Sequence, residues 1–226
     1  METDLPPLAL DIDGTLTTAA GPIDPRAFDL LADWEAPVVL ATGKSFPYPV
    51  ALAHYAGVPE TVVAENGGVV LVEGEVRHAG DPERARAAYR AFVDRGGDPG
   101  FTLEGTVNRW RETEVAVDRS RADEALLREV AAEFDLEVFD TGYAYHVKTP
   151  GVEKGDGLAV VADALGLDPS AFVAVGDSEN DASTFAVAGR SFAVANADER
   201  ARDAADVVLA EGYFDGTLAA VERVRG

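Results

Sequence analysis

The stretch between Pro7 and Thr17 constrains the fold more than any other part of the chain. It opens with a short apolar run that predicts a buried strand. Two carboxylates, Asp11 and Asp13, end that strand two residues apart, so their side chains point to the same side of an extended backbone. Gly14 then allows the chain to turn sharply. A buried strand should not end in paired negative charges unless a positive group lies beside them. We therefore expect a charged site here rather than two solvated loop aspartates.

The charge balance excludes two classes of partner. The 226 residues include 41 acidic and 19 basic side chains, which gives a net charge of −22. Such a surface repels nucleic acids and anionic membranes, so we expect neither as a partner. This acidity, with only three lysines, resembles that of cytoplasmic proteins from salt-accumulating halophiles, and an ordinary acidic cytoplasmic protein is the alternative. Because lysine is so scarce, Lys44, Lys148 and Lys154 each become candidates for a functional role.

Composition also bears on location and size. No run is long enough to span a bilayer and no signal-peptide pattern stands at the N-terminus, so we expect a soluble cytoplasmic protein. The absence of cysteine excludes disulfides and thiolate-bound metals. The length suffices for one large domain or for a domain that carries a smaller insertion. We expect a monomer or a homodimer.

The order of the predicted elements indicates a doubly wound parallel α/β sheet that is interrupted by an insertion. Before the interruption the pattern is strand–helix–strand–helix–strand, and it ends in a hairpin around Glu73-Gly74. The predicted core strands are 7–11, 38–41, 61–64, 171–175, 192–194 and 206–209. The predicted core helices are 24–35, 50–55, 154–165, 199–203 and a closing helix from residue 214.

Residues 82–150 indicate a small α+β domain of their own. The predicted order is a helix, two strands, a second helix and two more strands, at 81–95, 101–103, 113–117, 121–134, 136–139 and 143–147. We therefore expect a core domain formed by residues 1–81 and 151–226, with residues 82–150 inserted as a separate unit.

Polar side chains follow three of the predicted core strands at one edge of the sheet, where ligands of open α/β sheets bind. These residues are Asp11 and Asp13, Thr42 and Gly43, and Asp177 and Asp181. Four carboxylates would repel one another without a cation, and ligands that offer only oxygen favour Mg²⁺. Lys154 begins a helix just after the insertion, where it can hold a bound anion together with Thr42.

These motifs resemble those of the haloacid dehalogenase superfamily of phosphatases, in the same order along the chain. They are 11–15 (DIDGT), 41–43 (ATG), Lys154 and 176–181 (GDSEND). An insertion between the second and third motifs is similar to the cap of the class that includes Cof-type sugar phosphatases, sucrose phosphatases and archaeal phosphoglycolate phosphatases. Its short length and the run 140–147 most resemble the last group. The resemblance therefore implies hydrolysis of a small phosphate ester, with 2-phosphoglycolate as the expected substrate.

The resemblance also implies a role for each motif residue. Asp11 would be the nucleophile that forms an aspartyl-phosphate, and Asp13 would act first as an acid and then as a base. Asn180 would orient the metal ligands. The phosphate-binding residues would be Thr42, Gly43 and Lys154, and the Mg²⁺ ligands would be Asp11, the backbone carbonyl of Asp13, Asp177 and Asp181.

Several alternatives stay open at this level. A sugar-phosphate phosphatase or a phosphomutase of the same cap class would carry the same motifs, as would a binding module without activity. Arg109, Arg111 and Lys148 are basic positions in or beside the insertion that a substrate carboxylate could use, although salt-bridged surface residues are the alternative. Glu65 and Asn66 end a core strand near the insertion, where they would contact either substrate or protein. The three histidines lack metal-ligand spacing, so we expect them to be structural or exposed.

Overall fold

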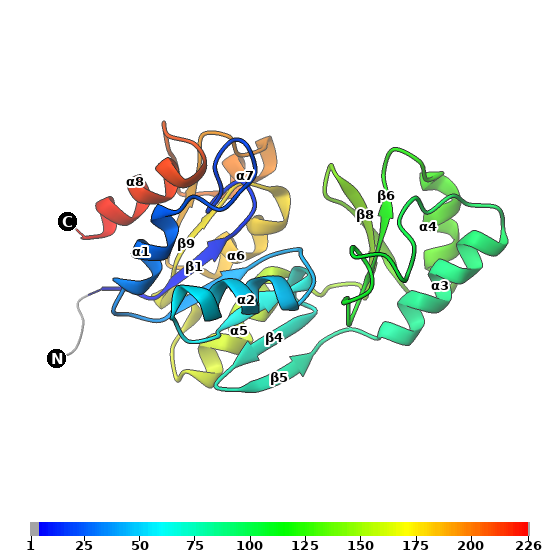
Figure 1. Cartoon of the computed structure of the whole chain (residues 1–226), viewed down its shortest axis with the longest axis horizontal. Coiled ribbons are helices and arrows are strands. Elements are labelled where there is room, and N and C mark those ends of the chain that lie inside the picture. Colours follow the sequence, from blue (N-terminus) through cyan, green and yellow to red (C-terminus); the bar gives the residue numbers. More distant parts are fainter. Residues whose placement is uncertain (1–4, 226) are drawn as a thin grey trace.

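The computed structural model describes residues 5–225 of the chain. It contains an eight-stranded sheet and a separate three-stranded sheet, which lie in two lobes (Figure 1). The outer limits expected for the core domain, residues 1 and 226, fall outside the described residues. Within residues 5–225, no helix is long and apolar enough to cross a membrane.

The strand β1 (Leu8–Asp11) lies near the centre of the large sheet, whose order is β11-β10-β9-β1-β2-β3-β4-β5. All pairs from β11 to β3 are parallel, whereas β4 and β5 form an antiparallel hairpin at one edge. The other strands are β2 (Val38–Ala41), β3 (Val62–Ala64), β4 (Val69–Val72), β5 (Glu75–His78), β9 (Val173–Gly176), β10 (Arg190–Ala193) and β11 (Val207–Val208). The α/β class and the mainly parallel doubly wound sheet are therefore confirmed.

Helices cover both faces of this sheet, because successive residues of a strand point to opposite faces. Leu8 and Leu10 of β1 belong to the apolar cluster that includes α1, α2 and α8, whereas Ala9 belongs to the cluster with α5, α6 and α7. Burial on both faces explains why the strand is apolar at each of these positions. The helices are α1 (Arg26–Ala32), α2 (Pro47–Ala56), α5 (Lys154–Ala164), α6 (Ala182–Val187), α7 (Glu199–Ala204) and α8 (Tyr213–Arg225).

The inserted lobe has a three-stranded antiparallel sheet in the order β6-β8-β7, with two helices packed against it. Its elements are α3 (Pro82–Asp94), β6 (Val115–Asp118), α4 (Glu124–Glu133), β7 (Glu137–Asp140) and β8 (Ala144–Lys148). Both helices follow a capping aspartate, Asp81 or Asp123, whose carboxylate accepts a hydrogen bond from a backbone N–H of the first turn. The cap at Asp123 explains why α4 starts three residues later than expected.

The strand predicted near residues 101–103 is wrong, because bends and turns occupy this segment. A side chain instead covers the free edge of β6. Asn108 Oδ1 accepts a hydrogen bond from the N–H of Ala116 at 2.7 Å, and its Nδ2 donates to the Ala116 carbonyl at 2.9 Å. These are the two hydrogen bonds that a neighbouring strand would make. β6 also starts later than expected, because the N–H of Thr113 donates to the Glu65 carboxylate rather than to a strand.

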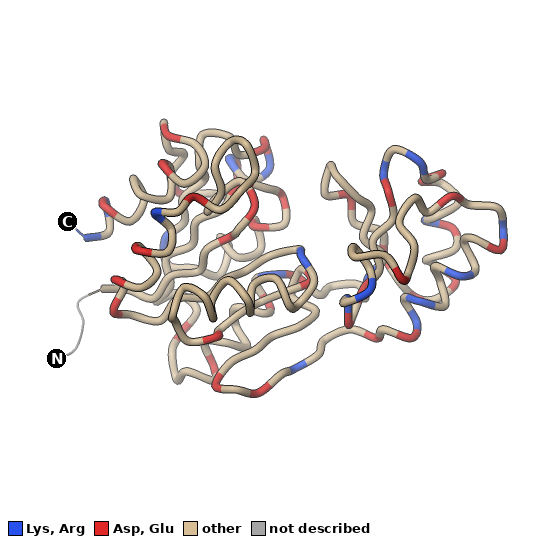
Figure 2. Tube along the Cα trace, viewed as in Figure 1, with Lys and Arg blue, Asp and Glu red and all other residues tan. Residues whose placement is uncertain are grey.

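Acidic and basic residues are distributed differently over the two lobes. Acidic residues are spread over both lobes (Figure 2), so the net charge of −22 is not confined to one of them. Ten of the nineteen Lys and Arg residues lie within positions 82–150. The inserted lobe is therefore the richer source of positive groups for a site between the lobes.

Candidate active site

Asp11, Thr42 and Asp177 stand at the carboxyl ends of adjacent strands. Asp11 is the last residue of β1, and the other two directly follow β2 and β9, which are its neighbours in the large sheet. Because parallel strands bring these ends to the same edge, the three side chains share one site. A 3-10 turn, η3 (Glu179–Asp181), adds Asp181 from just beyond β9.

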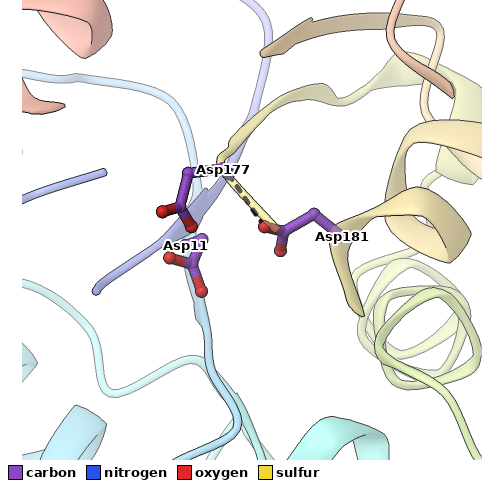
Figure 3. A group of neighbouring side chains, drawn as sticks. All are labelled: Asp11, Asp177 and Asp181. Atoms are coloured by element: carbon purple, nitrogen blue, oxygen red, sulfur yellow. Dashed lines mark hydrogen bonds between the residues drawn. The ribbon is translucent and has the colours of Figure 1, made fainter. Parts of the chain in front are cut away.

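Three carboxylates form a cluster at this edge. Asp11, Asp177 and Asp181 each offer an oxygen that lies within 4.8 Å of the others, and Figure 3 shows the side chains facing one another. Backbone N–H groups of Asp177 and Ser178 donate to Oδ2 of Asp181 at 3.0 and 3.1 Å, which fixes that carboxylate. Oδ2 of Asp11 is buried and has no hydrogen-bond partner among the described residues. A buried oxygen without a partner costs free energy, and a bound cation would remove that cost. Oδ2 of Asp11 is therefore a candidate ligand atom.

Lys154 is the positive group that the chain itself supplies to this cluster. It is the first residue of α5 and is fully buried. Its Nζ donates to Oδ1 of Asp11 and to Oδ1 of Asp181, both at 2.7 Å. Burial alone would lower the pKa of Lys154, but the two carboxylates outweigh it and raise the pKa, so the amine stays charged.

Burial is the main cause of the raised pKa values of Asp11 and Asp177. It raises the pKa of the Asp11 carboxyl well above its ordinary value, against the attraction of Lys154. Burial and repulsion by Asp181 raise the pKa of Asp177 to about 7. The charge of Lys154 therefore does not offset the effect of burial at Asp11 and Asp177, and a further cation would lower both pKa values. Ligands that are all carboxylate oxygens fit a hard divalent cation.

The fourth expected carboxylate, Asp13, lies apart from the cluster. Its side chain is half-exposed, and its Oδ1 lies 3.1 Å from Nζ of Lys44. Gly14 follows with a φ of 83°, and a Cβ at this position would collide with the carboxylate of Asp177. Glycine is therefore required at the turn. Asp13 and Asp11 nevertheless line the same cavity.

Thr42 and Gly43 form the part of the site that follows β2. Thr42 is buried, and its Oγ1 accepts a hydrogen bond from the N–H of Lys44 at 3.1 Å. A Cβ on Gly43 would lie only 2.9 Å from Oδ1 of Asn66, so the close approach of backbone and side chain favours glycine. Thr42 and Gly43 line the same cavity as Asp11.

Asn180 makes its side-chain hydrogen bonds to neighbours of the carboxylate cluster. Its Nδ2 donates to Oδ1 of Asn66 at 3.0 Å, and its Oδ1 accepts from the hydroxyl of Ser178 at 2.8 Å. Asn66 and Glu65 have left-handed φ angles of 55° and 52°, which non-glycine residues adopt where their surroundings impose it. The structure thus places Asn180 one residue away from Asp181 and links it to Asn66.

Glu65 joins the core lobe to the inserted lobe. Its carboxylate accepts hydrogen bonds from the N–H groups of Glu112 and Thr113 and from the Thr113 hydroxyl, at 2.8 to 3.0 Å. Burial and the nearby Glu114 raise the pKa of Glu65 to about 7, against the attraction of Arg111. Of the two roles left open for Glu65, the structure shows contact with protein.

A cavity of about 510 Å³ lies between the two lobes. The core lobe contributes Asp11 and Thr42 to its lining, and the inserted lobe contributes Arg111 and His146. The cavity therefore has two carboxylates of the cluster, Asp11 and Asp177, in one wall and basic side chains in another. Such a space accepts a small anionic molecule that contacts both lobes.

The three basic candidates occupy different places. Arg111 is buried and lines the cavity that holds Asp11, whereas Arg109 is exposed on a turn of the inserted lobe. Lys148 lines a second cavity of about 380 Å³ that adjoins Lys154, and its Nζ pairs with Glu137 at 2.7 Å.

Sequence reasoning made Lys44 a functional candidate without assigning it a role, and it missed Glu114 altogether. The scarcity of lysine is the signal that finds Lys44, since all three lysines line one of the two cavities. No pattern in the chain marks Glu114, whose partners Asn66 and His146 are far away in sequence. His146 was expected to be structural or exposed, and it is a buried residue of the cavity wall.

Residues 8–95 and 112–221 match the family of haloacid dehalogenase-like hydrolases. The chain belongs to this family. The resemblance seen in the motifs is therefore confirmed. A phosphoglycolate phosphatase of Halorubrum lacusprofundi is 66% identical over 223 residues, which cover 98% of each chain. A phosphoglycolate phosphatase of Natronomonas pharaonis is 54% identical over 221 residues and 97% of each chain. A Thermoplasma acidophilum protein of known crystal structure has the same fold, with a TM-score of 0.84, 23% identity and 98% of each chain covered.

Proposed function

We propose that the chain is a Mg²⁺-dependent phosphomonoesterase that hydrolyses 2-phosphoglycolate to glycolate and phosphate. The observation that carries this proposal is the cluster of Asp11, Asp177 and Asp181, in which Lys154 pairs with Asp11 and Asp181. Asp11 and Asp177 line the cavity between the lobes. The choice of substrate is supported by two relatives that are called phosphoglycolate phosphatases and align over nearly the whole chain.

In the first step a carboxylate oxygen of Asp11 attacks the phosphorus of the substrate. The bond between phosphorus and the ester oxygen breaks, and the electron pair stays on that oxygen, which takes a proton from the carboxyl group of Asp13. Glycolate leaves, and the phosphoryl group remains on Asp11. Lys154 and the backbone N–H groups around Thr42 and Gly43 hold the phosphoryl oxygens during the transfer.

In the second step a water molecule attacks the phosphorus of the aspartyl-phosphate. Asp13, now ionised, takes the proton of the attacking water, and the bond between phosphorus and the Asp11 oxygen breaks. Phosphate leaves, and the carboxylate of Asp11 is restored. Asp13 suits this double task because it lines the same cavity as Asp11 but stands outside the carboxylate cluster.

A divalent cation fits the residues present, because the donors are all oxygens and Oδ2 of Asp11 has no hydrogen-bond partner within residues 5–225. The residues that would hold Mg²⁺ are Asp11, Asp177, Asp181 and, through its backbone carbonyl, Asp13. When bound, the ion offsets the negative charge that builds up between the Asp11 carboxylate and the phosphoryl group. Asn180 steadies the turn that carries Asp181 through its bond to Ser178.

Residues 82–150 act as a cap in this proposal, and residues 1–81 with 151–226 form the catalytic core. The cap closes the cavity over Asp11 and keeps out water that would weaken the electrostatic interactions. A cavity of about 510 Å³ suits a small metabolite. Nucleic acids and anionic membranes are unsuitable partners for a chain with a net charge of −22.

The test is phosphate release from a panel of phosphate esters in molar KCl, with Mg²⁺ and with a chelator, and with Asp11→Asn as the inactive control. We expect the highest kcat/KM for 2-phosphoglycolate, and no release with the chelator or from the variant. A higher kcat/KM for a hexose phosphate would show that the proposed substrate is wrong. Formation of an isomerised sugar phosphate would identify a phosphomutase. If no ester is hydrolysed in the presence of Mg²⁺, the proposal is rejected, and a binding module without activity is the remaining interpretation.

A further inference from the structure

The cap contributes a buried group of three charged side chains to the cavity wall, namely Glu114, Arg111 and His146. Nδ1 of His146 lies 2.7 Å from Oε1 of Glu114, and Arg111 forms an ion pair with the same oxygen. The other oxygen, Oε2, accepts a hydrogen bond from Nδ2 of Asn66 at 3.2 Å. Glu114 thus ties both basic side chains to one place.

Both carboxylate oxygens of Glu114 are occupied by these partners. Burial would raise its pKa, but the charges of His146 and Arg111 outweigh burial and hold the pKa at about 2. The carboxylate is therefore ionised, and each of its oxygens already has a donor. The ionised carboxylate requires a hydrogen on Nδ1 of His146, and Nε2 donates to a ligand when the ring carries its second hydrogen.

The remaining donors of Arg111 and His146 are uncommitted. In Arg111, Nε donates to the Val107 carbonyl and Nη1 to the Gly43 carbonyl, both at 3.1 Å. No residue within 5–225 forms a hydrogen bond with Nη2 of Arg111 or with Nε2 of His146. Both side chains line the cavity that contains Asp11. These nitrogens are the ones available to a ligand.

Arg111 lies close enough to the proposed phosphate-binding loop for one short substrate to contact both. Its contact with the Gly43 carbonyl places the guanidinium beside the loop that we assign to the phosphoryl group. In 2-phosphoglycolate a single methylene joins the ester oxygen to the carboxylate. When the phosphate of 2-phosphoglycolate is bound at the loop, its carboxylate would therefore be close enough to contact the guanidinium of Arg111.

We propose that Arg111 and His146 form a carboxylate-binding subsite, held in position by Glu114, which selects phosphate esters that carry a carboxylate next to the ester carbon. This inference rests on the proposed phosphatase function. Nη2 of Arg111 suits a carboxylate because its N–H groups belong to a permanently charged guanidinium, and such charge-assisted hydrogen bonds are stronger than neutral ones. Arg111 also lies in the segment 96–111, which falls outside the match to the haloacid dehalogenase-like family. A specificity device is expected in such a segment, because the substrate differs between members while the chemistry does not.

The experiment compares kcat/KM for 2-phosphoglycolate with kcat/KM for 2-hydroxyethyl phosphate, which has a neutral group in place of the carboxylate. The main variant is Arg111→Met combined with Glu114→Gln, because removing both groups avoids leaving the Glu114 carboxylate buried without the Arg111 charge. A second variant, Arg111→Lys, keeps the charge but loses Nη2 together with the Nε and Nη1 hydrogen bonds that hold it in place. The control is Arg109→Met, which removes an exposed arginine two residues away. Circular dichroism melting in molar KCl checks that each variant folds.

We expect the ratio of the two kcat/KM values to fall about 10- to 100-fold in the double variant, since a hydrogen bond to a charged group contributes in that range. Arg111→Lys should give an intermediate loss, and Arg109→Met should leave the ratio unchanged. A general structural defect would lower both values equally and keep the ratio, which would overturn the subsite. An unchanged ratio in a folded, active Arg111→Lys would overturn it too. A wild-type protein that ignores 2-phosphoglycolate would instead overturn the proposed function.

Discussion

Replacing Lys154 by methionine should destabilise the protein and abolish phosphatase activity. Methionine keeps much of the length of the side chain but removes the charge that lies 2.7 Å from both Asp11 and Asp181. Lys154 is fully buried, and so are its two partners. The carboxylates would then face one another in the interior without the cation that the chain supplies.

The expected loss follows from this burial. Removing one partner of a buried ion pair costs about 3–5 kcal/mol, because the charge that remains has no compensation. Lys44→Met is a matched control, since it removes a lysine that also pairs with an aspartate of the site. Lys44 and Asp13 are 44% and 53% exposed in their side chains, so the loss there should be about 0–1 kcal/mol. The two variants should therefore differ by at least about 2 kcal/mol in the free energy of unfolding.

The assay is urea unfolding in molar KCl at neutral pH, with divalent cations removed so that Lys154 is the compensating charge. The deficit of Lys154→Met should shrink as the pH falls, because the pKa of Asp11, already raised by burial, rises further without the lysine. Equal free energies of unfolding for Lys154→Met and Lys44→Met at neutral pH would refute the claim that Lys154 compensates the buried carboxylates.

Three further results are expected. Asp13→Asn should lower kcat by about 10²- to 10⁴-fold in steady-state assays while the binding of Mg²⁺, measured by titration calorimetry, changes little, because the backbone carbonyl of Asp13 is kept. The melting temperature should rise between low salt and molar KCl, because salt screens the repulsion of 41 acidic against 19 basic residues; a flat profile would reject the halophilic interpretation. Burial would raise the pKa of Glu114, but His146 and Arg111 lower it from 4.5 to about 2, so its contribution to stability is present above pH 4.5 and is lost as the pH falls toward 2. This contribution is about 3 kcal/mol, and Glu114→Gln should lack that part of the pH dependence of unfolding; parallel curves for the two proteins would contradict it.

The core lobe could be predicted because its signals are local. Apolar runs such as 8–10 and 173–175 are buried on both faces, and each ends at a polar residue that the parallel sheet carries to the same edge. Lys154 was identifiable because it opens a helix directly after the insertion and is one of only three lysines. The acidic composition predicted a halophilic protein, and the relatives of the chain include proteins of halophilic archaea.

The inserted lobe could be predicted less well, because contacts between residues far apart in sequence shape it. The strand expected near 101–103 gives way to turns, since the side chain of Asn108 pairs the edge of β6 in its place. The start of β6 moves because Glu65, 48 residues earlier, binds Thr113. Glu114 accepts a hydrogen bond from Asn66, which is also 48 residues away in sequence. Periodicity reports which face of an element is buried, and it contains no information about such pairings.

The stereochemical course at phosphorus tests the covalent role of Asp11 most directly. A thiophosphate ester of glycolate, made chiral with heavy oxygen isotopes, is hydrolysed in isotopically labelled water, and the configuration of the released thiophosphate is determined. Each in-line displacement inverts the configuration, so transfer to Asp11 followed by transfer to water should give net retention. Net inversion would mean that water attacks the substrate directly, and it would contradict an aspartyl-phosphate on Asp11.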